Sequence, residues 1–360
     1  MNLSQAINLL IAGQNLSRDV TYQCFESIIK NEVSSMDQGG FLAALTSKGA
    51  TPAEIAAIRQ AICDLDTEKV SVFTDKPLAE NSGTGMDTFK TFNISTAASV
   101  TAAACGVAMA RHGSRGITSK CGTIDVAEAL GVAVEIPVTQ VGKSIEQCGL
   151  GLFNGMSPLV HPRGLARILG ECSFGTVLNI AASLANPVSP VYGIRGVNDP
   201  AILLSTAQIM KNIGYKNVFV MHGYGPDDQP AIDEASTIGK TAFTFINSTG
   251  KIISDQFMPE DLGLTRITPE AIATTGDPKR EAIRLTNILS GKGSKAETEI
   301  VALNAAIILT TTELAENLQT GLKMAFDALH TGKAKTKLNE WINAQQREPV
   351  ELKLNQQNIA

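Results

Sequence analysis

Aromatic residues and positive charge are both scarce in this sequence. Phe, Trp and Tyr make up only 5% of the 360 residues, with a single Trp, so the chain offers little for stacking against nucleic-acid bases. Lys and Arg number 30 against 35 Asp and Glu, which gives a formal net charge of -5 at pH 7. Because no surplus of positive charge exists to neutralise a phosphate backbone, nucleic acid is not expected to be the main partner.

Recognisable metal, disulfide and membrane patterns are also missing. The six cysteines form no CxxC pair, and the four histidines never stand at HxxxH spacing. This spacing is more typical of reduced thiols in a cytosolic protein than of a disulfide framework or a zinc site. The first residues have no cationic region before their apolar stretch, and no apolar run reaches about 18 residues, so neither a signal peptide nor a membrane span is expected. Since 44% of the residues are hydrophobic, we expect a globular, cytoplasmic protein with a sizeable core.

Residues 1–66 have the pattern of several short helices. Residues 51–54, Thr-Pro-Ala-Glu, have the spacing of a capping box with Pro in the first helical turn. The apolar side chains that follow lie on one helical face, at Ile55, Ile58 and Ile62. Nothing in this segment carries obvious chemistry. The sequence therefore predicts a small helical domain, joined by helices from about residues 155–175, with a role in packing or dimerisation.

From about residue 70 the pattern changes to short β-rich runs that alternate with helical stretches. The runs lie at residues 70–73, 132–136, 176–180 and 218–221. Such alternation favours an α/β domain with a largely parallel sheet, here over residues 70–345. Residues 241–246 and 251–257 are predicted to form a hairpin, and residues 296–345 are predicted to be helical again. Residues 346–360 form a polar tail that we expect to be loosely ordered.

A glycine-rich stretch at residues 82–87, Ser-Gly-Thr-Gly-Met-Asp, is followed by polar residues that open a helix. Glycines let the backbone approach an anion closely, and the unpaired amides and positive dipole end of a helix start bind phosphate. Asn93, Ser95 and Thr96 add side-chain donors, and Ser95 has an oxygen suited to a metal. An ordinary glycine turn with Ser/Thr caps explains the same residues about as well.

The stretch of residues 111–123 combines three cations, three glycines and several hydroxyls. This density favours a loop that wraps a polyanion over an ordinary solvated basic loop. A third stretch places Asp233 and Glu234 beyond the β-run at residues 218–221, where carboxylates suit Mg²⁺, although a surface acidic pair is the commoner explanation. Together the three stretches predict a site for a magnesium–diphosphate substrate. The sequence shows no arrangement of a nucleophile with its base, which fits a leaving group activated by metal and positive charge.

The order of these motifs resembles the anthranilate phosphoribosyltransferase family, which is itself similar to pyrimidine-nucleoside phosphorylases. The resemblance covers nearly all of residues 5–345, and it is carried by KGATPAEI, SGTGMD, TFNISTAA, RHGSR with TSKCGT and DVAEALGV, LNIAASLANP, VMHG, the Asp233-Glu234 pair, PEDLGL and ALNAA.

The family resemblance implies a small helical domain packed on a larger α/β domain with a mostly parallel central sheet, and a homodimer formed through the helices. It implies that an aromatic amine attacks the ribose of phosphoribosyl pyrophosphate while pyrophosphate leaves with Mg²⁺, in the default case with anthranilate as acceptor for tryptophan biosynthesis. Magnesium-binding positions match Ser95, Asp233 and Glu234. Positions for phosphoribosyl pyrophosphate match Gly83, Asp87, Thr91, Asn93, Ser95, Thr96, Arg111, Ser119 and Thr123.

Departures from the family motifs concentrate around the acceptor. The last glycine of the GTGGD motif is Met86, the Asn of KHGN is Ser114, and the Gly-Pro of NLLGPLTNP is Ala182-Ser183. Candidate residues for the acceptor pocket are His112, Ser114, Arg167 and Ser183, with Arg163 as an alternative partner for an acceptor carboxylate. The loop before Asp233 is longer than in the family, so Asp227 and Asp228 are further candidate metal ligands.

Three other functions stay open at this point. One is a paralogous transferase with a different aromatic or heterocyclic acceptor. The others are a non-catalytic binding protein on the same fold and a nucleoside phosphorylase, which needs phosphate and releases ribose 1-phosphate.

Overall fold

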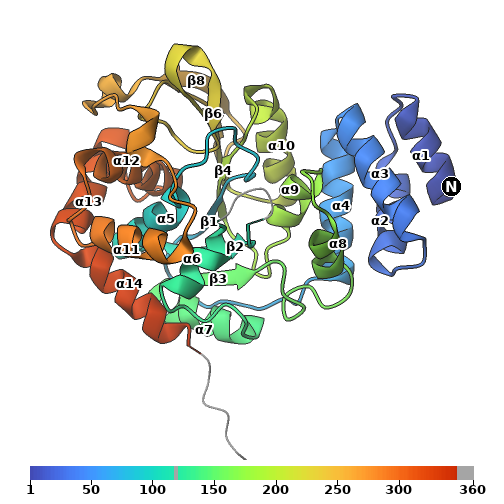
Figure 1. Ribbon diagram of the computed structural model, residues 1–360, viewed down its shortest axis with the longest axis horizontal. Helices are drawn as coiled ribbons and strands as arrows, with labels where there is room; N and C mark the ends of the chain where they lie inside the picture. The colour runs from blue at the N-terminus through green and yellow to red at the C-terminus, as the bar shows by residue number, and fades with distance from the viewer. Residues whose placement is uncertain (117–120, 347–360) are drawn as a thin grey trace, which may run out of the picture.

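The computed structural model describes residues 1–116 and 121–346. Ser119 and the tail beyond residue 346 therefore lie outside the described residues. The described chain has the predicted fold class: a small N-terminal helical domain and a larger α/β domain with a mostly parallel sheet (Figure 1). No helix in the described ranges has both the length and the apolar character that crossing a membrane requires.

Four helices form the N-terminal domain: α1 (Leu3–Ile11), α2 (Arg18–Ile29), α3 (Ser35–Lys48) and α4 (Pro52–Leu65). The predicted capping box is confirmed, because Thr51 Oγ1 accepts from Glu54 N while Glu54 Oε2 accepts from Thr51 N at 2.7 Å. Apolar faces of these helices meet in a core around Phe25 and Phe41, both fully buried.

Two short helices connect this core to the α/β domain. Apolar side chains of α8 (Leu165–Glu171) and α9 (Leu178–Ala181) pack in the same cluster as the N-terminal helices. The cluster continues through α10 (Leu203–Ile213) to β5 (Asn217–Tyr224). In Figure 1, α9 lies between α4 and the sheet, and α8 overlaps the lower part of α4 in this view. The apolar core therefore runs without a break from the helical domain to one face of the sheet.

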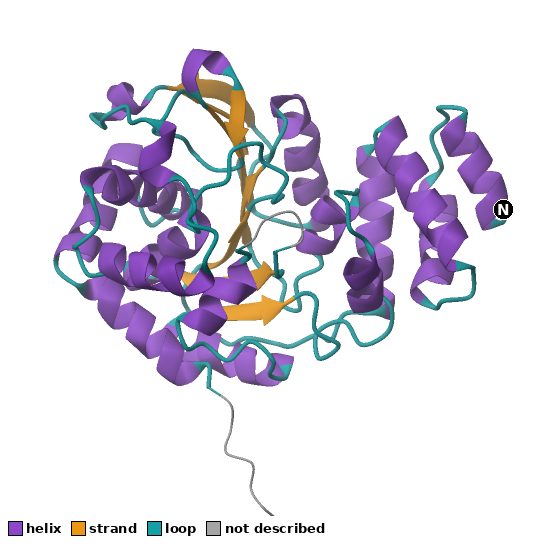
Figure 2. Ribbon diagram, viewed as in Figure 1, coloured by secondary structure: helices purple, strands orange, loops and turns teal. Residues whose placement is uncertain are grey.

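The sheet runs in the order β3-β2-β1-β4-β5-β7-β8, with β6 paired to β5. The first five strands of this order are parallel, and β6, β7 and β8 are antiparallel. Figure 2 shows the strands between two layers of helix. The remaining strands are β1 (Leu78–Ser82), β2 (Ala108–Gly113), β3 (Leu150–Asn154), β4 (Tyr192–Gly196), β6 (Pro230–Ile232), β7 (Thr241–Ile246) and β8 (Ile252–Phe257).

The longest helix, α12 (Lys295–Thr311), is buried along nearly all of its length. It packs with α5 (Ile94–Ala104) and α13 (Leu318–His330), and both belong to the main core. These helices cover the face of the sheet opposite α10 (Figure 1). The predicted helical segment at residues 296–345 is confirmed. The other helices of the α/β domain are α6 (Thr123–Ala129), α7 (Val138–Cys148), α11 (Pro278–Leu289) and α14 (Lys333–Ala344).

The strands predicted in the second half of the sequence are confirmed, and those predicted nearer the N-terminus are wrong. The hairpin is confirmed as β7 and β8, and the run at residues 218–221 lies inside β5. Residues 70–73 and 132–136 are not strands, because no neighbouring strand pairs with them, although Val132, Val134 and Ile136 alternate in burial. Residues 176–180 are mostly helical, since Asn179 Oδ1 accepts from Thr176 N and starts the turn of α9.

Candidate functional site

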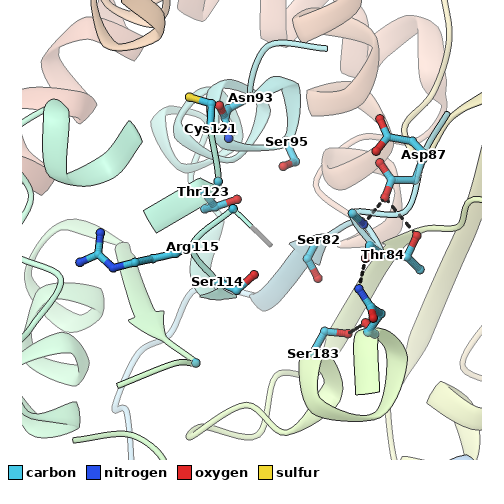
Figure 3. A pocket seen from close by; sticks show the side chains of 18 of the residues that line it. Ser82, Thr84, Asp87, Asn93, Ser95, Ser114, Arg115, Cys121, Thr123 and Ser183 are labelled. Carbon is cyan, nitrogen blue, oxygen red and sulfur yellow. Dashed lines mark hydrogen bonds between the residues drawn. The ribbon is translucent and has the colours of Figure 1, made fainter. Parts of the chain in front are cut away.

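The carboxyl ends of β1 and β2, and Gly155 just after β3, open onto one cavity with a volume of about 210 Å³. Chain connections run from β1 to β2 and β3 on one side and from β4 to β5 on the other, so the strand order reverses between β1 and β4. Ligands of open α/β sheets bind outside the carboxyl ends of strands at such a reversal. In Figure 3 the side chains of Ser82, Ser95 and Ser114 surround this space.

Most of the predicted site residues line the cavity together. Thr96 and Arg167 are not among the lining residues. The predicted residues that line it are Gly83, Asp87, Thr91, Asn93, Ser95, Arg111, His112, Ser114, Thr123, Ser183, Asp233 and Glu234.

Arg111 is the buried cation of the site, with only 3% of its surface exposed. Its Nη1 donates to Thr96 Oγ1 at 2.6 Å, its Nη2 to Ser95 Oγ at 3.0 Å, and its Nε to the Asn81 carbonyl. Burial lowers the pKa of Arg111 to about 10, with Glu234 opposing the shift, so the guanidinium stays charged at neutral pH. Thr96 is fully buried and orients Arg111, which is why it does not reach the cavity as a ligand contact.

Three carboxyl side chains, those of Asp87, Asp233 and Glu234, lie at one end of the cavity. Burial and then the charge of Asp233 raise the pKa of Asp87 to about 6, although Lys90 forms an ion pair with Asp87 at 2.8 Å. Burial, Asp233 and Asp87 raise the pKa of Glu234 well above its ordinary value. In the described part of the chain, Oε2 of Glu234 is buried without a hydrogen-bond partner. A buried carboxyl oxygen without a partner is costly, and a cation at this end of the cavity would pair with it and favour the ionised form of Glu234.

These donors suit a hard divalent cation such as Mg²⁺. No three His, Cys, Asp or Glu side chains of the described residues are grouped closely enough to hold a metal by themselves. Mg²⁺ usually binds one or two carboxylates together with substrate phosphates and water. Asp233 and Glu234 therefore fit a cation whose other ligands are water or substrate phosphates.

The loop after β1 and the start of α5 form the side of the cavity that is best suited to an anion. Asn93 is the N-cap of α5, and its side chain makes no capping hydrogen bond, so it faces the cavity with Ser95. The helix N-terminus supplies a partial positive charge at this point. Thr84 and Gly85 also line the cavity, and sequence reasoning missed them although they belong to the recognised glycine motif.

The opposite end of the cavity has mixed polarity. His112 is 7% exposed, and its Nε2 lies 3.2 Å from His161 Nε2. Burial, and then the neighbouring His161, lower the pKa of His112 to about 3, so this imidazole is neutral. Ser183 Oγ donates to the Asn179 carbonyl and accepts from Arg195 Nη1 at 2.9 Å. Apolar side chains complete the wall at Leu169, Leu178 and Ala182.

Four of the residues proposed from the sequence lie elsewhere. Arg167 Nη1 donates to Gln38 Oε1 and Nη2 to the Ile28 carbonyl, so its guanidinium is held by the helical domain. Arg163 does not line the cavity either. Asp228 forms an ion pair with Lys240 at 2.9 Å, and neither Asp227 nor Asp228 lines the cavity, so these carboxylates do not join the metal site in this structure.

Arg115 lines the cavity but directs its charge away from it, as Figure 3 shows. Its guanidinium forms ion pairs with Asp125 at 3.1 Å, Glu128 at 2.9 Å and Glu135 at 3.5 Å. Among the described residues of this loop region, Arg111 is therefore the cation that lies behind Ser95 at the cavity.

Comparisons with known proteins agree with this architecture. The model of the glycosyl transferase family a/b domain matches residues 75–335, and that of the helical bundle domain of the same family matches residues 4–65. The fold and the site thus define a two-domain glycosyltransferase.

Curated relatives narrow this class. Anthranilate phosphoribosyltransferase from Methanosphaera stadtmanae is 30% identical over 341 residues, covering 93% of this chain and 97% of the relative. The enzyme of the same name from Petrotoga mobilis is 33% identical over 334 residues, covering 92% and 94%. The chain belongs to the anthranilate phosphoribosyltransferase family, and it is a phosphoribosyltransferase enzyme.

Solved structures agree on the fold. The crystal structure of anthranilate phosphoribosyltransferase from Thermus thermophilus has a TM-score of 0.82 and 29% identity, covering 94% of this chain and 99% of that one. The Saccharomyces cerevisiae enzyme in complex with PRPP and Mg has a TM-score of 0.80 at 23% identity, covering 95% and 97%. Because its identity is only 23%, the similarity to the Saccharomyces cerevisiae enzyme shows the fold alone.

Proposed function

We propose that this protein transfers the phosphoribosyl group from phosphoribosyl pyrophosphate to an aromatic amine in a Mg²⁺-dependent reaction. Anthranilate is the first acceptor to test, because it is named in the relatives, and tryptophan biosynthesis is the corresponding pathway. The observation that carries the proposal is the meeting of three parts in one cavity: the glycine loop, the buried Arg111 and the Glu234 oxygen without a partner.

The reaction forms a bond from the amine nitrogen to the anomeric carbon and breaks the bond from that carbon to pyrophosphate. Positive charge develops on the ribose and negative charge on the departing diphosphate. Asn93, Ser95 and the N-terminus of α5 would bind the phosphates, and Arg111 would stabilise their charge from behind. Asp233 and Glu234 would hold Mg²⁺, which supplies additional charge stabilisation to the leaving group.

In this proposal the protein does not have to supply a strong general base. An arylamine nitrogen is largely unprotonated at neutral pH, so it attacks without a strong general base, and its surplus proton can pass to water. His112 is neutral and its Nε2 already contacts His161, so we assign it to the acceptor wall rather than to proton abstraction. Ser114 and Ser183 would provide hydroxyl contacts to the acceptor.

A different aromatic or heterocyclic acceptor is the second candidate. The position of Arg167 favours it, since this guanidinium is bound to Gln38 and the Ile28 carbonyl and leaves an acceptor carboxylate without that partner. Growth of a tryptophan auxotroph that lacks this transferase would separate the candidates. Robust growth supports anthranilate, and failure by a folded, phosphoribosyl-pyrophosphate-binding protein supports another acceptor.

We also propose that the protein is a cytoplasmic homodimer. Residues 1–66, together with α8, are proposed as the dimerisation unit and residues 70–345 as the substrate-binding unit. Two exposed apolar side chains on the helical domain, Ile11 and Met36, support the dimer. The free state of the six cysteines supports a reducing compartment. Equilibrium sedimentation of the full chain tests the oligomeric state.

The proposed reaction is tested with one double variant and a matched control. Asp233→Asn with Glu234→Gln keeps side-chain shape but removes two charges, and turnover should fall by roughly a hundredfold or more, the effect of losing a transition-state electrostatic contact. The control is Asp227→Asn with Asp228→Asn, which removes two charges outside the cavity and should leave turnover unchanged. Calorimetric titration with phosphoribosyl pyrophosphate and Mg²⁺ checks binding separately. Unchanged turnover of the first variant at limiting Mg²⁺ would contradict the assignment.

A further inference from the structure

The carboxylate of Asp233 is hydrogen-bonded to the glycine loop that lies across the cavity. Its Oδ2 accepts from Gly85 N at 2.6 Å and from Thr84 Oγ1 at 3.1 Å. Gly83 brings the loop close, since a Cβ at this position would lie 2.4 Å from the same oxygen. Figure 3 shows the two bonds as dashed lines that end on one carboxylate oxygen next to Thr84.

The two donors that Asp233 occupies are the groups with which such a loop binds an anion. Backbone amides and hydroxyls at a glycine turn form short, charge-assisted bonds to phosphate oxygens. In this structure an internal carboxylate takes that place. A diphosphate that uses Gly85 N and Thr84 Oγ1 must therefore first displace Asp233.

Glu234, the next residue, differs from Asp233 in this respect. Both side chains are buried, at 8% and 4% exposure, and both line the cavity. Oε2 of Glu234 has no hydrogen-bond partner, whereas Oδ2 of Asp233 has two in the loop. Of the two side chains, only Asp233 is bonded to the donors of the loop.

We infer that Asp233 has two alternative partners, the Thr84–Gly85 loop in the absence of cation and the divalent cation in its presence. A cation that draws the carboxylate away frees both donors for the diphosphate, so metal and diphosphate strengthen each other's binding. By thermodynamic linkage, bound diphosphate strengthens cation binding by the same factor as bound cation strengthens diphosphate binding. The inference rests on the proposed magnesium–diphosphate site and adds an exchange of hydrogen bonds to it.

The first experiment measures amide hydrogen exchange in the full-length protein. Gly85 is exposed and its N–H donates to Asp233, so exchange of this amide reports on that bond. Addition of MgCl₂ alone, without any phosphate compound, should accelerate exchange in a peptide that contains Gly85. Unchanged exchange at a Mg²⁺ concentration that calorimetry shows to be bound would overturn the inference.

The second experiment titrates sodium pyrophosphate in the presence of EDTA at about pH 8 and compares Asp233→Asn with Asp87→Asn. The pKa of Asp87 is about 6, so at this pH each variant removes one negative charge from the same cluster. Asp233→Asn also weakens a charge-assisted bond to the loop, and it should therefore bind pyrophosphate about tenfold tighter than Asp87→Asn does. Equal affinities would show that Asp233 does not compete for the loop donors.

A further variant covers the case in which Asp233→Asn fails to fold. Thr84→Val keeps all charges and the shape of the side chain, but it removes one of the two bonds to Asp233. Faster exchange at Gly85 supports the inference, and unchanged exchange contradicts it. If instead no variant and no wild-type protein binds phosphoribosyl pyrophosphate with Mg²⁺, the proposed function fails rather than this exchange of partners.

Discussion

The buried imidazole pair beside the cavity should make the stability of the fold depend on pH. His112 and His161 are almost fully buried, and their Nε2 atoms lie 3.2 Å apart. Burial, followed by the neighbouring His161, lowers the pKa of His112 to about 3, although a hydrogen bond with the Ser183 backbone opposes this shift. Burial also lowers the pKa of His161, against the hydrogen bond of its Nδ1 with the Asp66 carbonyl.

The direction and size of the effect follow from proton linkage. An unfolded His has a pKa of about 6.5, so above this pH neither the folded nor the unfolded chain is protonated at His112. Between about pH 6.5 and the folded pKa, only the unfolded chain takes up the proton. Unfolding is therefore favoured by about 1.4 kcal/mol for each pH unit of acidification. At about pH 5, His112 alone should have lowered the free energy of unfolding by about 2 kcal/mol.

Urea denaturation at about pH 7.5 and about pH 5 tests this reasoning with His112→Gln. The variant should lose about 2 kcal/mol less on acidification than the wild type does, because Gln does not titrate. His330→Gln is the control, since His330 is exposed on α13 and its replacement should leave the loss unchanged. An equal loss in His112→Gln and the wild type would refute the burial argument.

Three further predictions concern packing around the site. Gly196→Ala places a Cβ 1.4 Å from the Asp233 carbonyl oxygen, so we expect loss of Mg²⁺-dependent pyrophosphate binding, measured by calorimetry in whatever fraction folds. Asp66→Ala removes the acceptor for three backbone N–H groups at the start of α8 and should cost about 2–4 kcal/mol in urea denaturation. Arg195→Met leaves Glu80 buried and unpaired, which should cost about 3–5 kcal/mol; adding Glu80→Leu should recover much of that loss, and strictly additive losses would contradict the buried pair.

Motifs for the site could be predicted because glycines and polar side chains cluster at fixed spacings. The residues of the glycine loop and the Asp233-Glu234 pair are far apart in sequence, yet the cavity brings them together. Predictions from the resemblance failed where the family pattern itself changes. Arg167 is an arginine in the expected region, but the hydrogen bonds of its guanidinium to Gln38 and Ile28 depend on how α8 packs against the helical domain.

The strands β1 and β2 escaped prediction because their residues are atypical of strands. Residues 108–113 read Ala-Met-Ala-Arg-His-Gly, and residues 78–82 include Glu80 and Asn81. These strands are central, so burial on both faces replaces the usual alternation of apolar and polar residues. Arg195 was missed for a related reason, since its fully buried charge is stabilised by Glu80, 115 positions earlier in the chain. Only the tertiary fold shows that pairing.

Hydrogen bonds join the two ends of the cavity, and this bears on how the proposed reaction is aligned. Ser183 Oγ on the acceptor wall donates to the Asn179 carbonyl, and Asn179 Nδ2 donates to the Thr84 carbonyl in the diphosphate loop at 3.1 Å. Arg195 fixes Ser183 from behind, through Nη1 to Oγ and Nη2 to the carbonyl. Displacement at the anomeric carbon requires the incoming nitrogen within about 3–3.5 Å of that carbon and in line with the leaving oxygen. Because Asn179 of α9 is bonded to both Ser183 and the loop, we expect α9 to fix the distance between the two sides of the cavity.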